Sequence, residues 1–356
     1  MKKQLLIISF TLITIFSVHA QTADPRWSTE QAGQWYEQQS WVCGFNYIPA
    51  NAINYTAMWD KTSFSPEVID RELALAEKTG FNTVRVVLQY LVWEDDPEYF
   101  KETFSKFLDI CARHQIKAMP TFFDDCVFGK ETDPVLGKQP EPLKGWYAWA
   151  WSPSPGHSRV TDPATYPSLE KYVKDMLTTY QDDERVLLWD LYNEPTNGGL
   201  GDKSLPLVHK VFEWAREVHP AQPVSIAYWN DNEALNEIIL ANSDVITFHS
   251  YDAKKRLKEK IAYLQQQNRP MICTEWLNRP QQSTVSDILP VFYEENIGSL
   301  HWGLVNGKTQ THLPWGHRPG DPEPKVWQHD LFTGDLTPYA PKELALFRQY
   351  IEDSEK

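Results

Sequence analysis

The sequence predicts an α/β protein that forms a single (β/α)8 TIM barrel. Short runs rich in β-branched and aromatic residues alternate eight times with segments of helical periodicity along the 356-residue chain. Eight such units are the number that closes a barrel, and a typical barrel needs about 250 residues. An open, doubly wound sheet is the alternative, but no glycine-rich phosphate turn follows the first expected strand.

Each expected strand is short and mostly apolar, as a strand covered by helices must be. The expected strands are 41–47, 83–89, 117–123, 186–192, 224–229, 245–250, 271–276 and 299–305. The expected helices are 66–79, 99–114, 168–180, 205–219, 233–241, 254–267, 285–296 and 342–352. Pro66 and Pro206 lie near helix starts, where a missing N–H costs little, and Gly80 and Gly298 each separate a helix from the next strand.

The first 20 residues predict an export signal. Lys2 and Lys3 precede an apolar run over 5–16, and the sequence V-H-A at 18–20 is typical of a cleavage site. Because a membrane-spanning helix needs about 20 apolar residues, a membrane anchor explains this segment less well than a cleaved signal does. No later stretch is apolar enough to predict a helix that crosses a bilayer. We therefore expect a signal peptide at 1–20, a barrel domain at 21–356 and a periplasmic or extracellular location.

Composition excludes several classes of function. The net charge of −14 argues against nucleic acid, because phosphate binding needs a basic surface. The cysteines lack paired zinc spacing, although export permits a disulfide among Cys43, Cys111, Cys126 and Cys273. No H-x-H, H-E-x-x-H or G-x-S-x-G motif occurs, so we expect no metal or other cofactor and no esterase of the elbow type. The sequence leaves the oligomeric state open.

Two long segments carry much of the aromatic content, which is 13% of the chain. They cover 124–164, after the third strand, and 306–341, after the eighth, so both belong to the face where barrel enzymes bind substrate. Trp149, Trp151, Trp315 and Trp327 lie in these segments and are candidates to stack on sugar rings. Such loops favour a cleft closed at one end and exo action, while an open, endo-acting groove remains the alternative.

Two glutamates end apolar strands at equivalent places. Glu194 follows the fourth strand in W-D-L-Y-N-E-P, and Glu275 ends the seventh in M-I-C-T-E-W. Either residue alone can be explained as a cap or as the partner of an arginine. Together they predict two carboxyls at one rim, which is the pair that cleaves a glycosidic bond.

These motifs resemble the retaining glycoside hydrolases of clan A, and most closely glycoside hydrolase family five, the cellulase and mannanase group. The resemblance extends from Trp41 to Val305. It implies that Glu194 is the general acid/base, that Asn193 holds the substrate 2-hydroxyl and that Glu275 is the nucleophile. It also implies a carbohydrate substrate and hydrolysis of O-glycosyl bonds.

Four further positions match the pattern of this family. Arg85 in T-V-R-V-V resembles the arginine that bonds the nucleophile, and His249 and Tyr251 in F-H-S-Y resemble its H-x-Y pair. Trp302 resembles the aromatic floor under the reacting sugar. A cation and a phenol beside Glu275 are expected to lower its pKa, whereas an apolar wall is expected to raise that of Glu194.

The sequence departs from the family pattern after the third strand. The family often carries a histidine there, but this chain has Phe122-Phe123-Asp124-Asp125-Cys126. Asp124 or Asp125 is a candidate for the missing contact with a substrate hydroxyl. Two alternatives to a retaining β-glycosidase remain: a non-catalytic carbohydrate-binding barrel, and a metal-dependent barrel hydrolase that uses these aspartates with His249 and Glu275.

Overall fold

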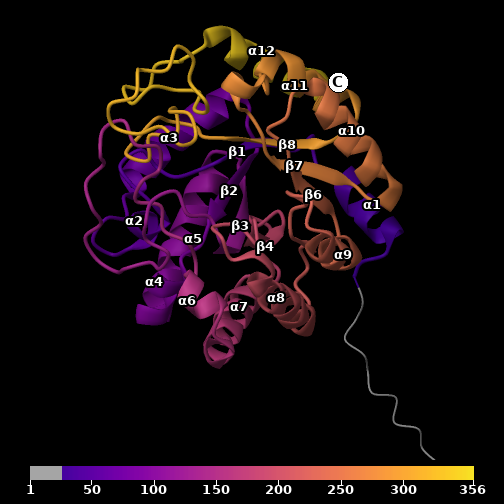
Figure 1. Ribbon diagram of the computed structural model, residues 1–356. Coiled ribbons are helices and arrows are strands. Elements are labelled where there is room, and N and C mark those ends of the chain that lie inside the picture. The colour runs from indigo at the N-terminus through magenta and orange to yellow at the C-terminus, as the bar shows by residue number, and fades with distance from the viewer. Residues whose placement is uncertain (1–25) are drawn as a thin grey trace, which may run out of the picture.

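The computed structural model describes residues 26–356 (Figure 1). The predicted signal peptide at 1–20 lies outside the described residues. Among the described helices, none is long and apolar enough to cross a membrane.

Eight parallel strands form the barrel that the sequence predicts, and Figure 1 looks into it. Their order is β5-β4-β3-β2-β1-β8-β7-β6. All eight expected strands are present; seven are shorter than the expected runs, and β3 extends one residue further, to Asp124. The strands are β1 (Cys43–Asn46), β2 (Thr83–Val87), β3 (Lys117–Asp124), β4 (Trp189–Asn193), β5 (Val224–Ser225), β6 (Ile246–His249), β7 (Met271–Glu275) and β8 (Gly298–Trp302).

The barrel closes between β5 and β6 through Tyr228, which lies three residues after the end of β5. Tyr228 donates its N–H to the Thr247 carbonyl at 2.9 Å and accepts from the His249 N–H at 3.0 Å. Regular pairing stops after Ser225, since the next N–H, that of Ile226, bonds to the Ser243 hydroxyl at 3.2 Å instead of to a strand. This explains why β5 is shorter than the expected strand at 224–229.

Helices cover the outside of the barrel, and each expected helix is present within a few residues of its predicted ends. The helices are α1 (Thr29–Glu37), α2 (Tyr55–Trp59), α3 (Pro66–Thr79), α4 (Tyr90–Asp95), α5 (Pro97–Arg113), α6 (His157–Val160), α7 (Tyr166–Thr179), α8 (Leu205–Val218), α9 (Glu233–Asn242), α10 (Lys254–Leu264), α11 (Val285–Glu294) and α12 (Pro341–Ser354). Four helices were not predicted: α1, which precedes the barrel, and α2, α4 and α6, whose four to six residues are too few to show periodicity.

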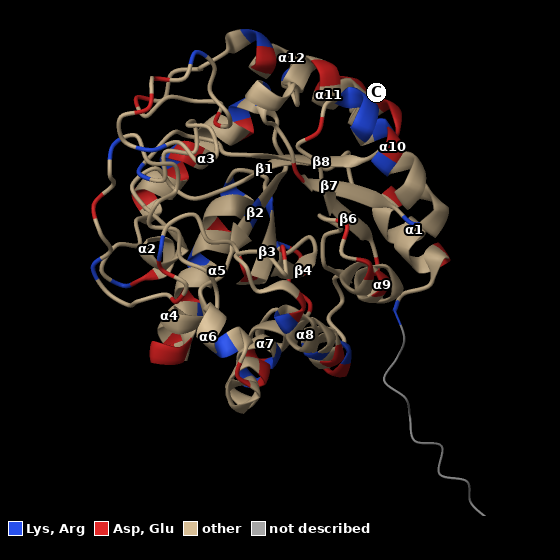
Figure 2. Ribbon diagram, viewed as in Figure 1, with Lys and Arg blue, Asp and Glu red and all other residues tan. Residues whose placement is uncertain are grey.

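Burial follows the alternation of strands and helices. Charged side chains lie mainly along the outer helices, whereas the strands carry few of them (Figure 2). Trp59, Trp93 and Trp214 are all buried. Trp59 contacts the rings of Phe100, Phe104 and Phe107 on α5, and each such ring contributes roughly 1.5–3 kcal/mol when fully buried. This packing gives the strand ends a rigid support.

The four cysteines are buried free thiols. The disulfide that export would permit is therefore not formed between any of them. Three of them belong to packed elements: Cys43 to β1, Cys111 to α5 and Cys273 to β7. Cys126 differs, because it follows β3 and lines the cavity described below.

Candidate active site

The carboxyl ends of the strands surround a cavity of about 490 Å³. Nine of the residues predicted for the site line it: Arg85, Trp151, Asn193, Glu194, His249, Tyr251, Glu275, Trp302 and Trp315. Strands β2, β4, β6, β7 and β8 thus deliver their predicted side chains to one place. Asp124 does not reach the cavity.

Glu194 follows β4 in a turn that holds it in the left-handed conformation, with φ of 43°. Its Oε2 accepts hydrogen bonds from Nδ2 of Asn197 at 2.6 Å and from the Cys126 thiol at 3.3 Å. Burial raises the pKa of this carboxyl, and the two donors act in the opposite direction. A non-glycine residue rarely adopts this conformation, so the turn is built to aim the side chain.

Glu275 is the last residue of β7, and both of its oxygens are bonded. Arg85 donates to Oε1 at 2.7 Å and the Tyr251 hydroxyl donates to Oε2 at 2.8 Å. Burial raises the pKa of Glu275 and outweighs the opposing effects of His249, Arg85 and Tyr251. The expected cation and phenol are therefore present and each lowers the pKa as expected, but burial outweighs them and the net shift is upward.

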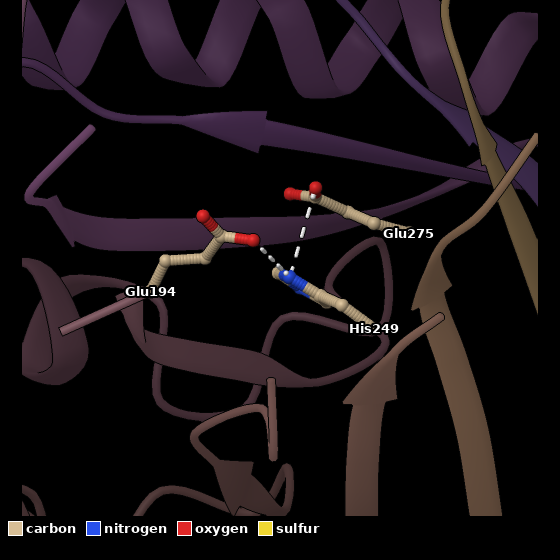
Figure 3. Close-up of side chains that lie close together, drawn as sticks. All are labelled: Glu194, His249 and Glu275. Atoms are coloured by element: carbon tan, nitrogen blue, oxygen red, sulfur yellow. Dashed lines mark hydrogen bonds and ion pairs between the residues drawn. The ribbon is translucent and has the colours of Figure 1, made fainter. Parts of the chain in front are cut away.

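His249 lies between the two carboxyls (Figure 3). Its Nδ1 is 2.8 Å from Oε1 of Glu194 and 3.6 Å from Oε2 of Glu275. Burial, helped by the charge of Arg85, lowers the pKa of His249 to about 4, so the ring is neutral near pH 7. One oxygen of each glutamate and one nitrogen of His249 lie within 4.8 Å of one another.

These three side chains are also close enough to hold a metal ion, but most of their ligand atoms already have partners. Glu275 bonds to Arg85 and Tyr251, as described above. The alternative set from the sequence analysis is not assembled, because Asp125 bonds to the hydroxyls of Tyr192 and Ser204 at 2.6 and 2.5 Å. The donor atoms of this site thus suit proton transfer better than metal binding.

Arg85 connects Glu275 to β4 and β1. It donates to Asp190 at 2.6 and 2.9 Å, and to Asn193 and Asn46 at 2.7 Å each. Burial alone would lower the pKa of Arg85, but the carboxylates of Asp190 and Glu275 raise it, so the guanidinium stays charged. Its fork shape fits these acceptors in a way that a lysine cannot.

Asp124 lies behind the cavity wall and is fully buried. It accepts hydrogen bonds from Nδ2 of Asn193 and Nε1 of Trp151, both at 2.8 Å, and from the Cys126 N–H at 3.0 Å. The expectation that Asp124 contacts a substrate hydroxyl is corrected: it holds Asn193 and Trp151, which line the cavity themselves.

The candidate sugar platforms divide into two groups. Trp151 and Trp302 line the cavity with ring centroids 5.9 Å apart, and Trp315 packs edge-on against Tyr251. Trp149 lines a separate cavity of about 310 Å³, and Trp327 stacks on Tyr339 at 4.5 Å. These last two indoles do not line the main cavity. Trp229 also lines the cavity, whereas Tyr192 is fully buried.

Several residues of the site escaped the sequence analysis. Lys260 lines the cavity from the middle of α10 and donates to the His249 carbonyl at 2.9 Å, a contact for which the sequence holds no signal. Asn197 was in principle detectable, because a turn brings a residue three positions after Glu194 back to it. The remaining missed residues of the wall include Tyr55, Cys126, Phe128 and Tyr147.

A barrel that presents two close carboxyls and an aromatic wall at the carboxyl ends of its strands defines the class of barrel glycoside hydrolases. Comparison of the sequence with known families gives the same answer. Residues 46–307 match the family described as Cellulase (glycosyl hydrolase family 5). The chain belongs to glycosyl hydrolase family 5.

Individual relatives are more distant. A probable mannan endo-1,4-β-mannosidase C of Aspergillus terreus is 28% identical over an alignment of 117 residues, which covers 25% of this chain and 29% of that protein. The chain thus matches less than a third of the length of this curated relative.

Solved structures share the fold at low identity. An endo-β-1,4-mannanase from Thermotoga petrophila has a TM-score of 0.58 at 14% identity, covering 90% of this chain and 78% of that one. A GH5_18 protein from Streptomyces cattleya in complex with GlcNAc has a TM-score of 0.60 at 13% identity, covering 88% and 80%. An exo-β-1,4-mannosidase from Opitutaceae bacterium strain TAV5 has a TM-score of 0.60 at 16% identity, covering 88% and 60%.

Proposed function

We propose that this protein is a retaining β-glycosidase that acts by double displacement, with Glu275 as nucleophile and Glu194 as general acid/base. The observation that carries this proposal is the proximity of the two carboxyls, which have oxygens within 4.8 Å of each other. Retaining enzymes hold their carboxyls about 5–5.5 Å apart, whereas inverting enzymes need about 6.5–9.5 Å to admit a water.

The contacts of the two carboxyls assign their roles. Arg85 and Tyr251 both donate to Glu275, and hydrogen bonds to an anion favour its ionised form. Glu194 has no cation in contact, so the proton that two close carboxyls share goes to Glu194. Ionised Glu275 then attacks the anomeric carbon, while Glu194 gives its proton to the departing glycosidic oxygen.

The second half of the reaction returns both groups to their starting state. Once Glu275 is esterified, its negative charge is gone and the carboxylate of Glu194 becomes easier to form. Glu194 then takes a proton from water, which attacks the same carbon and releases the sugar with its original configuration. Asn193, fixed by Arg85 and Asp124, is the proposed partner of the substrate 2-hydroxyl.

We propose β-linked plant or microbial polysaccharides, or their oligosaccharides, as substrates. The cavity offers Trp151, Trp302 and Trp315 as apolar surfaces for sugar rings. Three of the relatives above have names that refer to mannan or β-mannoside hydrolysis. β-1,4-Mannosidic bonds are therefore the first linkage to test.

The loops after β3 and β8 support exo action or the cleavage of short chains. They lie beside each other at the barrel mouth, magenta and yellow in Figure 1, and are bonded directly. The N–H of Ala148 donates to the Thr309 carbonyl at 2.9 Å, and the side chain of Gln310 bonds the Gly145 N–H and the Leu143 carbonyl at 2.9 and 2.8 Å. A loop pair bonded in this way forms a continuous wall on one side of the cavity.

The proposal is tested by incubating the purified protein with β-mannans, β-glucans, xylans and galactans and with their oligosaccharides. We expect the protein to hydrolyse one of these classes of substrate. If the loop wall closes the cleft, the enzyme should release one or two sugar units at a time from one end of the chain. Glu275→Ala abolishes hydrolysis, and Glu237→Ala, an exposed glutamate on α9, is the matched control. Near-normal turnover in Glu275→Ala, or no product from any substrate, contradicts the proposal, and activity that chelators remove favours the metal alternative.

We also propose that the protein is exported. The support is the charged and apolar pattern of residues 1–20. Expression of the full chain in a bacterium, followed by fractionation and N-terminal sequencing, should yield a periplasmic or secreted protein that starts at Gln21. An uncleaved chain in the cytoplasm contradicts this proposal.

A further inference from the structure

Cys126 is the one cysteine that lines the catalytic cavity. It follows β3 by two residues, and its N–H is fixed by Asp124 at 3.0 Å. Its sulfur lies within 3.4 Å of side-chain atoms of Asn193, Glu194 and Asn197. The mechanism proposed above does not use this thiol.

The hydrogen-bond partners of these residues determine where the thiol proton points. Asn193 must turn its NH2 group toward Cys126, because its oxygen accepts from Arg85 at 2.7 Å. Asn197 must do the same, because its oxygen accepts from the Gly198 N–H at 2.6 Å. Both amides therefore donate to sulfur, and the single S–H is left for Oε2 of Glu194 at 3.3 Å.

The thiol remains protonated in this environment. Burial raises the pKa of Cys126 well above its usual range, and the nearby carboxylates of Asp124 and Glu194 raise it further. A thiolate would in addition face Oε2 of Glu194 without a proton between them. Cys126 is thus a permanent donor at the working pH of the enzyme, and its low nucleophilicity keeps it out of covalent chemistry.

We propose that Cys126 is a positioning residue for Glu194. Its thiol donates a hydrogen bond that fixes Oε2 of Glu194 and stabilises the carboxylate form of that residue. This inference rests on the proposed role of Glu194 as acid/base. Oε1 faces His249, so Asn197 and Cys126 supply the donors on the other oxygen. Loss of one donor destabilises the carboxylate, which the enzyme needs as the base in the second half-reaction.

The experiment measures kcat/KM against pH for the parent, Cys126→Ala and Cys126→Ser on one substrate. The basic limb of this profile reports the deprotonation of Glu194 in the free enzyme. In Cys126→Ala we expect the basic limb to move to higher pH by roughly 0.5 to 1 pH unit. The value of kcat/KM at the optimum should fall about three- to tenfold, which is the effect of one lost hydrogen bond. Cys126→Ser keeps a donor and should leave the limb near that of the parent.

Control variants separate this inference from the function on which it rests. Cys111→Ala removes a buried thiol on α5 and should not move the profile. If Cys126→Ala does not fold, Cys126→Val fills the space without a donor and replaces it. If the pH profiles of the parent and of the Ala or Val variant superimpose, and Glu194→Ala still loses activity, the role of Cys126 is overturned but the proposed function stands. If Glu194→Ala itself keeps full activity, it is the proposed function that fails.

Discussion

Replacement of Arg85 by alanine tests whether the site is held together by one buried cation. Arg85 and its partner Asp190 are 2% and 0% exposed, so their charges are almost fully removed from water. The guanidinium donates five hydrogen bonds, to Asp190, Glu275, Asn193 and Asn46. Arg85→Ala leaves two carboxylates buried without a cation and removes the link between β1, β2, β4 and β7.

The expected loss follows from the cost of breaking a buried ion pair. Removing one partner of such a pair costs about 3–5 kcal/mol, because the other charge stays buried. For a chain of this size that corresponds to a fall in Tm of roughly 4–7 °C. Urea unfolding followed by tryptophan fluorescence measures the free energy, and calorimetry measures the Tm.

Arg85→Lys is the matched variant, since it keeps the charge but not the fork of donors. We expect its stability to lie between those of the parent and Arg85→Ala, with strongly reduced activity in both variants. An unfolding free energy of Arg85→Ala within about 1 kcal/mol of the parent would refute the reasoning, because it would mean that the buried carboxylates do not depend on this cation.

Three further predictions concern single contacts. Tyr251→Phe removes the donor to Oε2 of Glu275 and should lower kcat by roughly 10- to 100-fold in steady-state assays, while thermal melting stays near the parent value; unchanged kcat contradicts it. Trp315→Ala removes an indole that is 39% exposed on the cavity wall and should raise KM about tenfold with less effect on kcat; an unchanged KM means that the ring does not contact sugar. Burial raises the pKa of Glu72 to about 7, so the protonated form is favoured in the fold, and the stability it confers is complete below pH 4 and is lost as the pH rises through 7. Glu72→Gln should flatten the dependence of unfolding free energy on pH by up to about 3 kcal/mol between pH 4 and 8, and equal slopes in both proteins contradict this.

The sequence predicts the barrel and the strand-borne part of the site well, because both follow from local patterns. An apolar run that ends in a carboxylate specifies a strand and places that side chain at its carboxyl end. Glu275 on β7 and Arg85 on β2 therefore meet as expected. No local pattern, however, fixes the balance between burial and neighbouring charges, so the net upward shift of the Glu275 pKa was not predicted.

The loop-borne part of the site is predicted less well, because it depends on contacts between distant segments. Asp124 was assigned to the cavity from its place after β3, but the indole of Trp151 covers it and takes up its oxygen. Trp327 was assigned to the wall from its loop, but Tyr339 stacks on it instead. Lys260 reaches the cavity only because α10 packs beside β6, which no short motif in its own helix records.

The most direct test of double displacement by Glu275 and Glu194 is the anomeric configuration of azide products. Aryl β-glycosides of the preferred sugar are incubated with azide and each alanine variant, and the products are analysed by NMR. Glu275→Ala should give the α-glycosyl azide, because azide replaces the nucleophile on the face opposite the leaving group. Glu194→Ala should give the β-glycosyl azide, because azide attacks the glycosyl-enzyme formed on Glu275. The same configuration from both variants, or the two configurations exchanged, would contradict the roles assigned to these two glutamates.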